Sequence, residues 1–378
     1  MLKQFIFLVY VVKTKIRHLF SPEKVSDRLL ILKMDAIGDY IIFRNFLREI
    51  AYSEKYKQCK ITVICDKALK ELALELDGDV IDNVISFDLQ PFLKNKIDIL
   101  KQAAVCKYRA VINFHYSRTP ETEIITWLTA ADEKVTIDGD TLRMSFWKKP
   151  IFNLIYNKLF IMPSDIKSEF GFNKALTEFI TGVKSHIEGP SLELDADRYD
   201  SKIEGPYLIV APGAGSVNRQ LRLSSYAKIV DFLIDKGYNV CFIGSPKDSL
   251  IVGEIINSLP HGHLNKITDL SGKTALGEMP YIINKSLGVI CNDSGPYHLS
   301  MALNKATICL AGGGHFERFV SYGNSKKVKL CYELMPCFNC NWQCIYKFNA
   351  TDPYPCLDAI DINKVFENIS LLEKEYMI

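Results

Sequence analysis

The chain has 378 residues, of which 48% are hydrophobic, and its 46 lysines and arginines are almost balanced by 44 aspartates and glutamates. The hydrophobic share allows a large core, and the length predicts about two to three domains. The near-neutral charge excludes a protein that binds nucleic acid through bulk positive charge.

The N-terminus combines an apolar run, residues 5–12, with the basic residues Lys13, Lys15 and Arg17. This run is too short to span a bilayer, which needs about 20 residues. We expect residues 1–20 to form a helix at a membrane surface, where the basic side chains meet anionic lipid. A helix packed on the first domain is the alternative. The absence of a small-residue cleavage site argues against a signal peptide.

The first strand-loop-helix unit ends its loop on a Gly-Asp pair. Residues 28–33 have the pattern of a fully buried strand, and residues 40–50 that of an apolar helix. Between them, Gly38 leaves space and Asp39 stands at the helix start. Asp39 therefore either caps the helix or projects into a cleft.

The rest of the first half alternates strand-like and helical runs, which predicts a parallel sheet with helices on both faces. The strand-like runs are 60–65, 80–85 and 110–114, and the helical runs are 69–76 and 92–104. A polar stretch between two Gly-Pro pairs then suits a linker.

The second half repeats the alternation. Strand-like runs lie at 207–211, 239–244 and 266–270, and helical runs at 226–234 and 279–285. The first of these strands leads into Gly213, Ala214 and Gly215, a loop whose backbone can approach a pyrophosphate closely.

A later loop of small polar residues follows another apolar run. Asp293, Ser294 and Gly295 supply an acceptor, a hydroxyl and a backbone without Cβ, and Pro296 suits a first helical turn. A helix N-terminus favours anions such as phosphate, so His298 would face a ligand there. The alternative is a strand-to-helix turn with a good N-cap.

Together these segments resemble the heptosyltransferases of glycosyltransferase family 9, which add heptose from a nucleotide-activated donor to bacterial lipopolysaccharide cores. Each motif alone is weak, but five in the right order are specific, and they occupy residues 31–39, 211–215, 242–248, 269–274 and 292–299. The resemblance implies an α/β fold of GT-B architecture, in which two Rossmann-like domains with parallel sheets face each other across a cleft.

The Gly-Pro pairs at 189–190 and 205–206 predict the domain limits, and the resemblance implies what each domain binds. Residues 1–190 are expected to bind the acceptor, residues 191–205 to form the linker, and residues 206–360 to bind the nucleotide-sugar. The second domain includes a cysteine-rich segment at 331–356. Residues 361–378 are expected to form a helix that packs back on the N-terminal domain.

For the reaction, the resemblance implies Asp39 as general base, because the family's functional carboxylate falls in the same Gly-Asp turn. Asp35 is the competing carboxylate. Arg219 stands where relatives carry a lysine in a Lys-x-Trp-Pro run and keeps its charge, whereas Leu221 and Arg222 depart from the tryptophan and proline.

The nucleotide-sugar donor is expected to bind the backbone of the glycine loop, a cationic side chain and the polar loop before the later helix. The residues are Gly213, Ala214, Gly215, Arg219, Asp248, Asp293, Ser294, Gly295, Pro296 and His298. Asp248 replaces a glutamate found in relatives, and a turn-stabilising role is the alternative for it.

The acceptor is expected to contact Gly38, His115 and Arg118, with a solvated loop as the alternative for the last two. Arg143 and residues 147–149 either line the same face or belong to a surface loop.

Five of the eleven cysteines lie near the C-terminus. Cys337, Cys340, Cys344 and Cys356 have a spacing that suits a structural zinc or iron site, with Cys331 as a substitute ligand. Relatives often carry cysteines here, and some bind iron. Free or redox-active thiols and disulfides are the alternatives, and the chemistry itself is expected to need no cofactor.

The resemblance implies an inverting glycosyltransferase that transfers heptose from an ADP-heptose-like donor to a bacterial surface glycan, a lipid-linked glycan or a protein. We expect it in the cytoplasm, on the inner face of the inner membrane, with no nucleic-acid partner. The alternatives are a catalytically inactive metal-binding assembly protein of the same fold and a nucleotide-sugar epimerase.

Overall fold

The structure is a computed structural model that describes residues 26–88, 92–195, 198, 203, 205–323 and 325–377. The chain divides into two compact units, Met1–Ile187 and Glu188–Ile378, which we call unit 1 and unit 2. The helix predicted at residues 1–20 lies outside the described residues. Among the helices of the described part, none is both long and apolar enough to cross a membrane.

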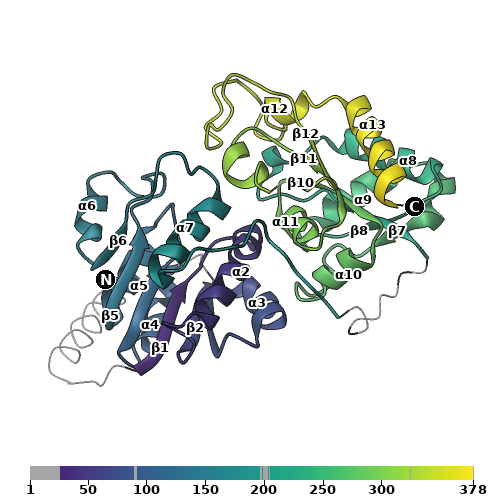
Figure 1. Ribbon diagram of the computed structural model, residues 1–378. Helices are drawn as coiled ribbons and strands as arrows, with labels where there is room; N and C mark the ends of the chain where they lie inside the picture. The colour runs from purple at the N-terminus through teal and green to yellow at the C-terminus, as the bar shows by residue number, and fades with distance from the viewer. Residues whose placement is uncertain are drawn as a thin grey trace. The chain divides into compact units, whose positions relative to one another are not determined.

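Unit 1 is built on a six-stranded parallel sheet in the order β3-β2-β1-β4-β5-β6 (Figure 1). The central strand β1 is covered on both faces, and its residues from Leu29 to Leu32 are fully buried, as a parallel sheet requires. The strands are β1 (Ser26–Leu32), β2 (Lys60–Asp66), β3 (Asn83–Phe87), β4 (Tyr108–Asn113), β5 (Ala131–Ile137) and β6 (Lys158–Phe160).

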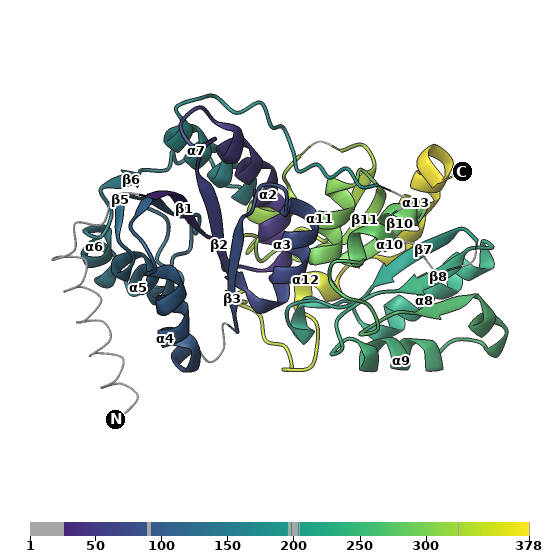
Figure 2. The same ribbon diagram turned by 90° about the horizontal axis from the view of Figure 1, so that it is seen from below.

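Helices cover both faces of this sheet. Figure 2 shows α2 and α3 on one face and α4 and α5 on the other. The helices of unit 1 are α2 (Ile37–Tyr52), α3 (Lys70–Asp77), α4 (Phe92–Ala103), α5 (Pro120–Leu128), α6 (Lys148–Asn153) and α7 (Glu169–Thr181). The helix α7 packs on α2. Ser168 caps its start by accepting a hydrogen bond from the Gly171 backbone.

Unit 2 contains a second six-stranded parallel sheet, in the order β12-β11-β10-β7-β8-β9. Its strands are β7 (Tyr207–Ala211), β8 (Asn239–Phe242), β9 (Ile267–Asp269), β10 (Gly288–Asn292), β11 (Ala306–Leu310) and β12 (Val328–Cys331). Its helices are α8 (Leu223–Asp235), α9 (Ser249–Asn257), α10 (Met279–Lys285), α11 (Gly295–Ala302), α12 (Pro355–Asp358) and α13 (Ile362–Leu372).

Both sheets have the same strand order, which is that of the Rossmann fold. The Rossmann-like architecture predicted for each half is therefore confirmed. In such sheets, ligands bind at the carboxyl ends of the strands where the order reverses. The reversal lies between β1 and β4 in unit 1, and between β7 and β10 in unit 2.

The C-terminal helix was expected on the N-terminal domain, and this expectation is wrong. Val365, Ile369 and Leu372 of α13 are fully buried within the core cluster of unit 2. Phe366 also stacks on Phe232 of α8, with ring centroids 4.4 Å apart. The apolar stripe of α13 thus finds its partners within unit 2, to which the helix belongs.

Candidate active site

In unit 1, a buried lysine organises the loops at the reversal point. Lys33 follows β1 directly and has no exposed surface. Its Nζ donates to Asp35 Oδ2 and Glu169 Oε1, each at 3.2 Å, and to the carbonyl of Phe114 at 3.4 Å. Burial alone would lower the pKa of Lys33, but the carboxylates of Glu169 and Asp35 outweigh burial and raise it well above its ordinary value. Lys33 is therefore a fixed positive charge.

Asp35 is held as a carboxylate by its neighbours. Lys33 lies at 3.2 Å, His115 Nε2 at 3.4 Å and Arg143 Nη1 at 3.9 Å from its oxygens. Burial acts to raise the pKa of Asp35, but these basic groups together lower it to about 2. A carboxylate so well stabilised has little tendency to accept a proton.

His115 joins the loop after β4 to the loop after β1. Its Nε2 accepts the backbone N–H of Met34 at 2.9 Å, and its Nδ1 lies 2.6 Å from Asn113 Oδ1. These partners require the neutral ring with its proton on Nδ1. Burial, the largest cause, lowers the pKa of His115 to about 4, so the ring is neutral at pH 7. Both ring nitrogens are engaged within the protein, and the direct acceptor contact predicted for His115 would break one of these bonds.

Asp39 lies in the first turn of α2, as predicted, directly after the buried Gly38. Its Oδ2 accepts the backbone N–H of Ala36 at 3.3 Å, which is the helix-capping alternative. A carboxylate oxygen of Asp39 also lies within 4.8 Å of oxygens of Asp35 and Glu169. The capping role and a place in the polar site are therefore compatible, since one half-buried carboxylate fulfils both.

Arg118, predicted to bind the acceptor, is buried in the loop between β4 and α5. Its side chain has 1% exposure, its Nη2 donates to the Asp138 carbonyl and to Asn153 Oδ1, and its Nη1 lies 3.5 Å from Glu123 Oε2. Burial outweighs Arg118 and raises the pKa of Glu123 to about 7. Arg118 Nε and Nη1 have no hydrogen-bond partner among the described residues, and a contact of Arg118 with the acceptor stays a prediction.

In unit 2, Gly213 at the end of β7 packs closely on the side chain of Asp248. A Cβ on Gly213 would lie 2.5 Å from Asp248 Cγ. The Oδ2 of Asp248 accepts bonds from the backbone N–H and the hydroxyl of Ser245, both at 2.7 Å. The turn-stabilising alternative for Asp248 is therefore present, and a contact of Asp248 with the donor stays a prediction.

Near the reversal point between β7 and β10, a guanidinium, a carboxylate and an imidazole lie close together. Arg219 Nη2 lies 3.4 Å from Asp293 Oδ2, and His298 Nε2 lies 3.7 Å from Asp293 Oδ1. His298 Nδ1 is bonded to the Tyr322 hydroxyl at 2.5 Å. Burial, and then Arg219, lowers the pKa of His298 to about 3, and burial raises the pKa of Asp293 against the effect of Arg219.

Two buried polar atoms here have no hydrogen-bond partner among the described residues, namely Arg219 Nε and Asn292 Oδ1. Helix α11 begins at Gly295, after Ser294 and before Pro296, so its N-terminus lies at the carboxyl end of β10. A helix N-terminus and an incompletely bonded guanidinium both suit an anion such as a diphosphate. The structure thus brings together Arg219, Asp293 and His298 of the predicted donor residues.

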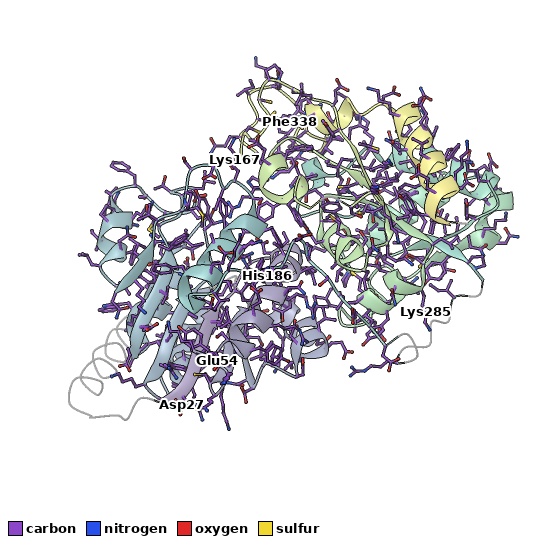
Figure 3. All side chains as sticks on the ribbon, in the orientation of Figure 1. Asp27, Glu54, Lys167, His186, Lys285 and Phe338 are labelled. Atoms are coloured by element: carbon purple, nitrogen blue, oxygen red, sulfur yellow. The ribbon has the colours of Figure 1, made fainter. Side chains whose placement is uncertain are left out.

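The cysteine-rich segment folds against this site. Trp342 places its ring 4.5 Å from the guanidinium carbon of Arg219 and donates from Nε1 to His315 Nδ1 at 3.2 Å. Phe338 of the same segment, labelled in Figure 3, packs on Phe316 with ring centroids 5.2 Å apart. Sequence reasoning missed Trp342, because no spacing rule relates it to Arg219. It also missed Glu169, for which no sequence signal exists, and Lys33, which ends an otherwise apolar strand.

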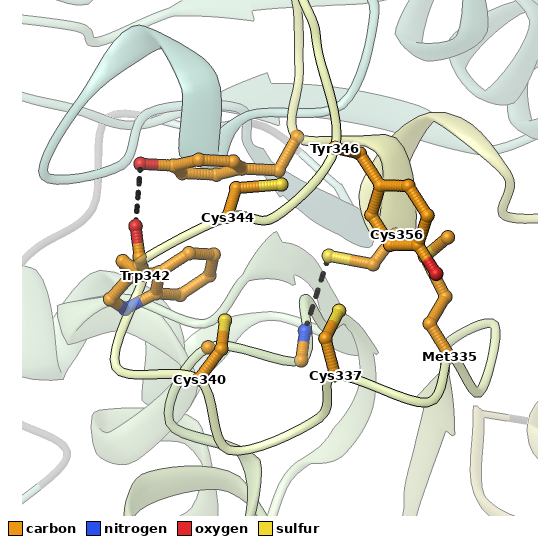
Figure 4. Close-up of a pocket in the computed structure, with 10 residues that line it drawn as sticks. Met335, Cys337, Cys340, Trp342, Cys344, Tyr346 and Cys356 are labelled. Carbon is orange, nitrogen blue, oxygen red and sulfur yellow. Dashed lines mark hydrogen bonds between the residues drawn. The ribbon is translucent and has the colours of Figure 1, made fainter.

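Four cysteines surround one small cavity (Figure 4), whose lining includes Cys337, Cys340, Cys344, Cys356, Met335, Trp342, Tyr346 and Tyr354. All four are half-buried with free thiols, and burial raises the pKa of Cys340 and Cys356. Their sulfurs are not among the groups of ligand atoms within 4.8 Å of one another in the described residues. A four-thiolate zinc site needs sulfurs about 3.8 Å apart, so an ion would draw them closer.

Cys331, the predicted substitute ligand, lies elsewhere. It is buried on β12, where Asn368 Nδ2 donates to its sulfur at 3.4 Å. It belongs to the core cluster of unit 2, so the substitute role is corrected.

Comparison with known proteins finds a family match over part of the chain. Residues 170–346 match glycosyltransferase family 9 (heptosyltransferase). Lipooligosaccharide heptosyltransferase 2 of Haemophilus influenzae is 37% identical over 29% of this chain and 32% of its own length, so that match spans about a third of the relative. Lipopolysaccharide core heptosyltransferase OpsX of the same organism is 24% identical over 81% of this chain and 84% of its own length.

The fold agrees over both units. The solved structure of Escherichia coli ADP-heptose lps heptosyltransferase II has a TM-score of 0.69 and 17% sequence identity, with 92% of this chain and 99% of that chain covered. This likeness confirms the GT-B fold class predicted from the motifs. The chain thus carries a glycosyltransferase family 9 (heptosyltransferase) domain over residues 170–346, which confirms the resemblance seen in its sequence.

Proposed function

We propose that the protein is an inverting glycosyltransferase that transfers heptose from ADP-heptose or a closely related donor to a hydroxyl of a lipopolysaccharide-core-like glycan. The observation that carries the proposal is the pair of polar sites at the two sheet reversal points. One is rich in carboxylates around Asp39, and the other has Arg219 and a helix N-terminus suited to a diphosphate. The names of the matched relatives supply the heptose and the glycan.

In the proposed reaction, the acceptor oxygen attacks the anomeric carbon of the donor while the bond from that carbon to the diphosphate oxygen breaks. The acceptor proton passes to Asp39, and the nucleoside diphosphate leaves with the bonding electron pair. A single displacement inverts the anomeric centre. Asp35 is the weaker candidate base because Lys33 and Arg143 help to hold its pKa at about 2.

On the donor side, we assign the diphosphate to Arg219, the N-terminus of α11 and the loop Gly213 to Gly215. Asp293 keeps the guanidinium in place. When the Tyr322 hydroxyl donates to Nδ1, the single N–H of the neutral His298 ring lies on Nε2 and can donate to the diphosphate. We expect these donor-side groups to lower the activation free energy more than the general base does, since hydrogen-bond donors aimed at a leaving group stabilise its charge as it develops.

We further propose that Cys337, Cys340, Cys344 and Cys356 bind one structural zinc or iron ion. Their shared cavity and half-burial support this set. The reaction is expected to proceed without a cofactor. The place of action that we propose is the cytoplasmic face of the inner membrane, where a lipid-linked acceptor would be available.

The proposal is tested by incubating the protein with a panel of nucleoside diphosphate sugars and a heptose-accepting core glycan. We expect transfer with ADP-heptose and inversion at the anomeric carbon in the product. A protein that binds the donor but forms no product would support the inactive assembly protein instead. Interconversion of the nucleotide-sugar without an acceptor would support the epimerase.

A further inference from the structure

Unit 1 exposes a run of large apolar side chains between Leu142 and Ile161. Phe146 is 80% exposed, Leu154 85% and Ile161 66%, while Leu142, Trp147 and Ile151 are 46%, 56% and 59% exposed. Single exposed apolar residues are ordinary, but six of them within 20 positions are unusual for a surface that meets only water. We call residues 142–161 the apolar rim.

Met144 and Tyr156 anchor the apolar rim in the protein, while its six exposed apolar side chains face outward. Helix α6 has no buried residue, and both views place it beside β6, the last strand of the sheet (Figures 1 and 2). Polar bonds hold the segment: Lys149 Nζ donates to the Gly139 carbonyl at 2.7 Å and Asn153 Nδ2 donates to Asp138 Oδ1 at 2.9 Å. A surface helix normally shows the reverse pattern, with its apolar stripe inward.

The charge of this segment is one-sided. Residues 141–164 contain Arg143, Lys148, Lys149 and Lys158 and no aspartate or glutamate, in a chain whose total charge is only +2. Lys149 and Lys158 are paired with Asp138 and Glu133 of neighbouring strands and loops. Lys148 Nζ lies 5.1 Å from the centre of the Trp147 ring. Tryptophan beside lysine is the composition of a membrane interface.

We propose that the apolar rim is the surface through which unit 1 binds an anionic lipid bilayer, with Phe146, Trp147 and Leu154 entering the headgroup region. Lysine is depleted in the cores of protein–protein interfaces, whereas it gains from anionic headgroups. The rim also adjoins the polar site, because Arg143 Nη1 lies 3.9 Å from Asp35 Oδ1. Binding by this surface does not depend on the proposed reaction.

The test uses the full chain and vesicles of phosphatidylcholine, with or without phosphatidylglycerol, and measures the bound fraction by sedimentation. We expect wild-type protein to bind the phosphatidylglycerol vesicles and to dissociate as salt rises. Phe146→Ser combined with Leu154→Ser should lower the partition coefficient at least tenfold, and Lys148→Glu should lower it on the anionic vesicles only. Leu250→Ser on α9, where the leucine is 78% exposed, is the matched control and should bind as wild type does.

An unchanged thermal shift with ADP will show that the variants are folded. The proposal is overturned if wild type binds neither vesicle. It is also overturned if the double variant binds as wild type does, and that second result would assign membrane contact to residues 5–12. It is also overturned if the double variant abolishes self-association in sedimentation velocity while vesicle binding persists, since the rim would then be an interface between two copies.

Discussion

At the scale of single residues, the polar sites are defined by which groups are charged and which are neutral. The two buried imidazoles, His115 and His298, are neutral because burial disfavours their protonated forms. Lys33 is charged because two carboxylates outweigh the same burial. The sequence shows all these residues but not their states, which depend on partners far away along the chain.

The neutral histidines predict a loss of stability on the acid side. The pKa of His115 is about 4 in the folded chain and close to 6.5 when unfolded. Below pH 6.5 the unfolded chain therefore binds a proton that the folded chain does not, so the free energy of unfolding falls as pH is lowered through this window. The expected loss from His115 is on the order of 2–3 kcal/mol by pH 4.5.

Urea unfolding at pH 7 and at pH 4.5 measures how much the free energy of unfolding falls between the two pH values. His115→Gln cannot gain the proton and should show a smaller difference between the two pH values than wild type, even if it is less stable at both. His186→Gln, which replaces an exposed histidine, is the control. An equal pH dependence in His115→Gln and wild type would contradict the neutral, bonded ring.

Arg219 tests the donor site at the same scale. Arg219→Ala should weaken ADP binding about 10- to 100-fold, because a charge-assisted bond to phosphate is lost, while adenosine binding should change little. Arg222→Ala is the matched control, since Arg222 is 45% exposed and pairs with Asp358 and Asp352. If calorimetry shows that wild type binds adenosine and ADP equally well, the assignment of the diphosphate to Arg219 is contradicted.

At the scale of elements, the cysteine-rich segment acts on the donor site through one ring. Trp342 lies between Cys340 and Cys344 in sequence and packs on Arg219. Glycine is needed at position 314, because a Cβ there would overlap the Trp342 ring. An ion bound by the four cysteines would fix the loop that carries this ring.

We therefore expect about one transition-metal ion per chain in protein purified under reducing conditions without chelator. Cys337→Ser or removal of the ion should weaken ADP binding severalfold, and Trp342→Leu should do so without loss of metal. Cys59→Ser, in unit 1, should change neither property. Elemental analysis without stoichiometric metal, with these four thiols titratable in the native protein, would refute the ion.

The elements also show what a sequence can predict. The strands with continuous apolar runs, such as β1, β7 and β10, were predicted because burial on both faces removes the alternation of polar residues. The loops that follow them were predicted as sites because parallel strands end at one edge. The packing of α13 was not, because its apolar stripe fits any apolar surface and only the structure shows that it meets α8 and β11.

At the scale of the whole molecule, we propose that unit 1 binds the acceptor and supplies the base, and that unit 2 binds the donor. The repeated strand order gives each unit one candidate ligand site, with carboxylates in unit 1 and cationic and helix-terminal groups in unit 2. The family resemblance implied this division, and three of its motifs, at 31–39, 211–215 and 292–299, include the loops at the two reversal points. The buried positions of His115 and Arg118 were not predictable, because a polar loop sequence does not show which side chains turn inward.

The most direct measurement is donor turnover by Asp39→Asn, with Asp35→Asn as the matched carboxylate variant and with ADP affinity measured in parallel. We expect Asp39→Asn to lower heptose transfer about 10²- to 10⁴-fold, as loss of a general base does, with nearly unchanged ADP affinity. Asp35→Asn should leave most of the turnover. Wild-type transfer by Asp39→Asn, or a greater loss in Asp35→Asn, would contradict Asp39 as the base.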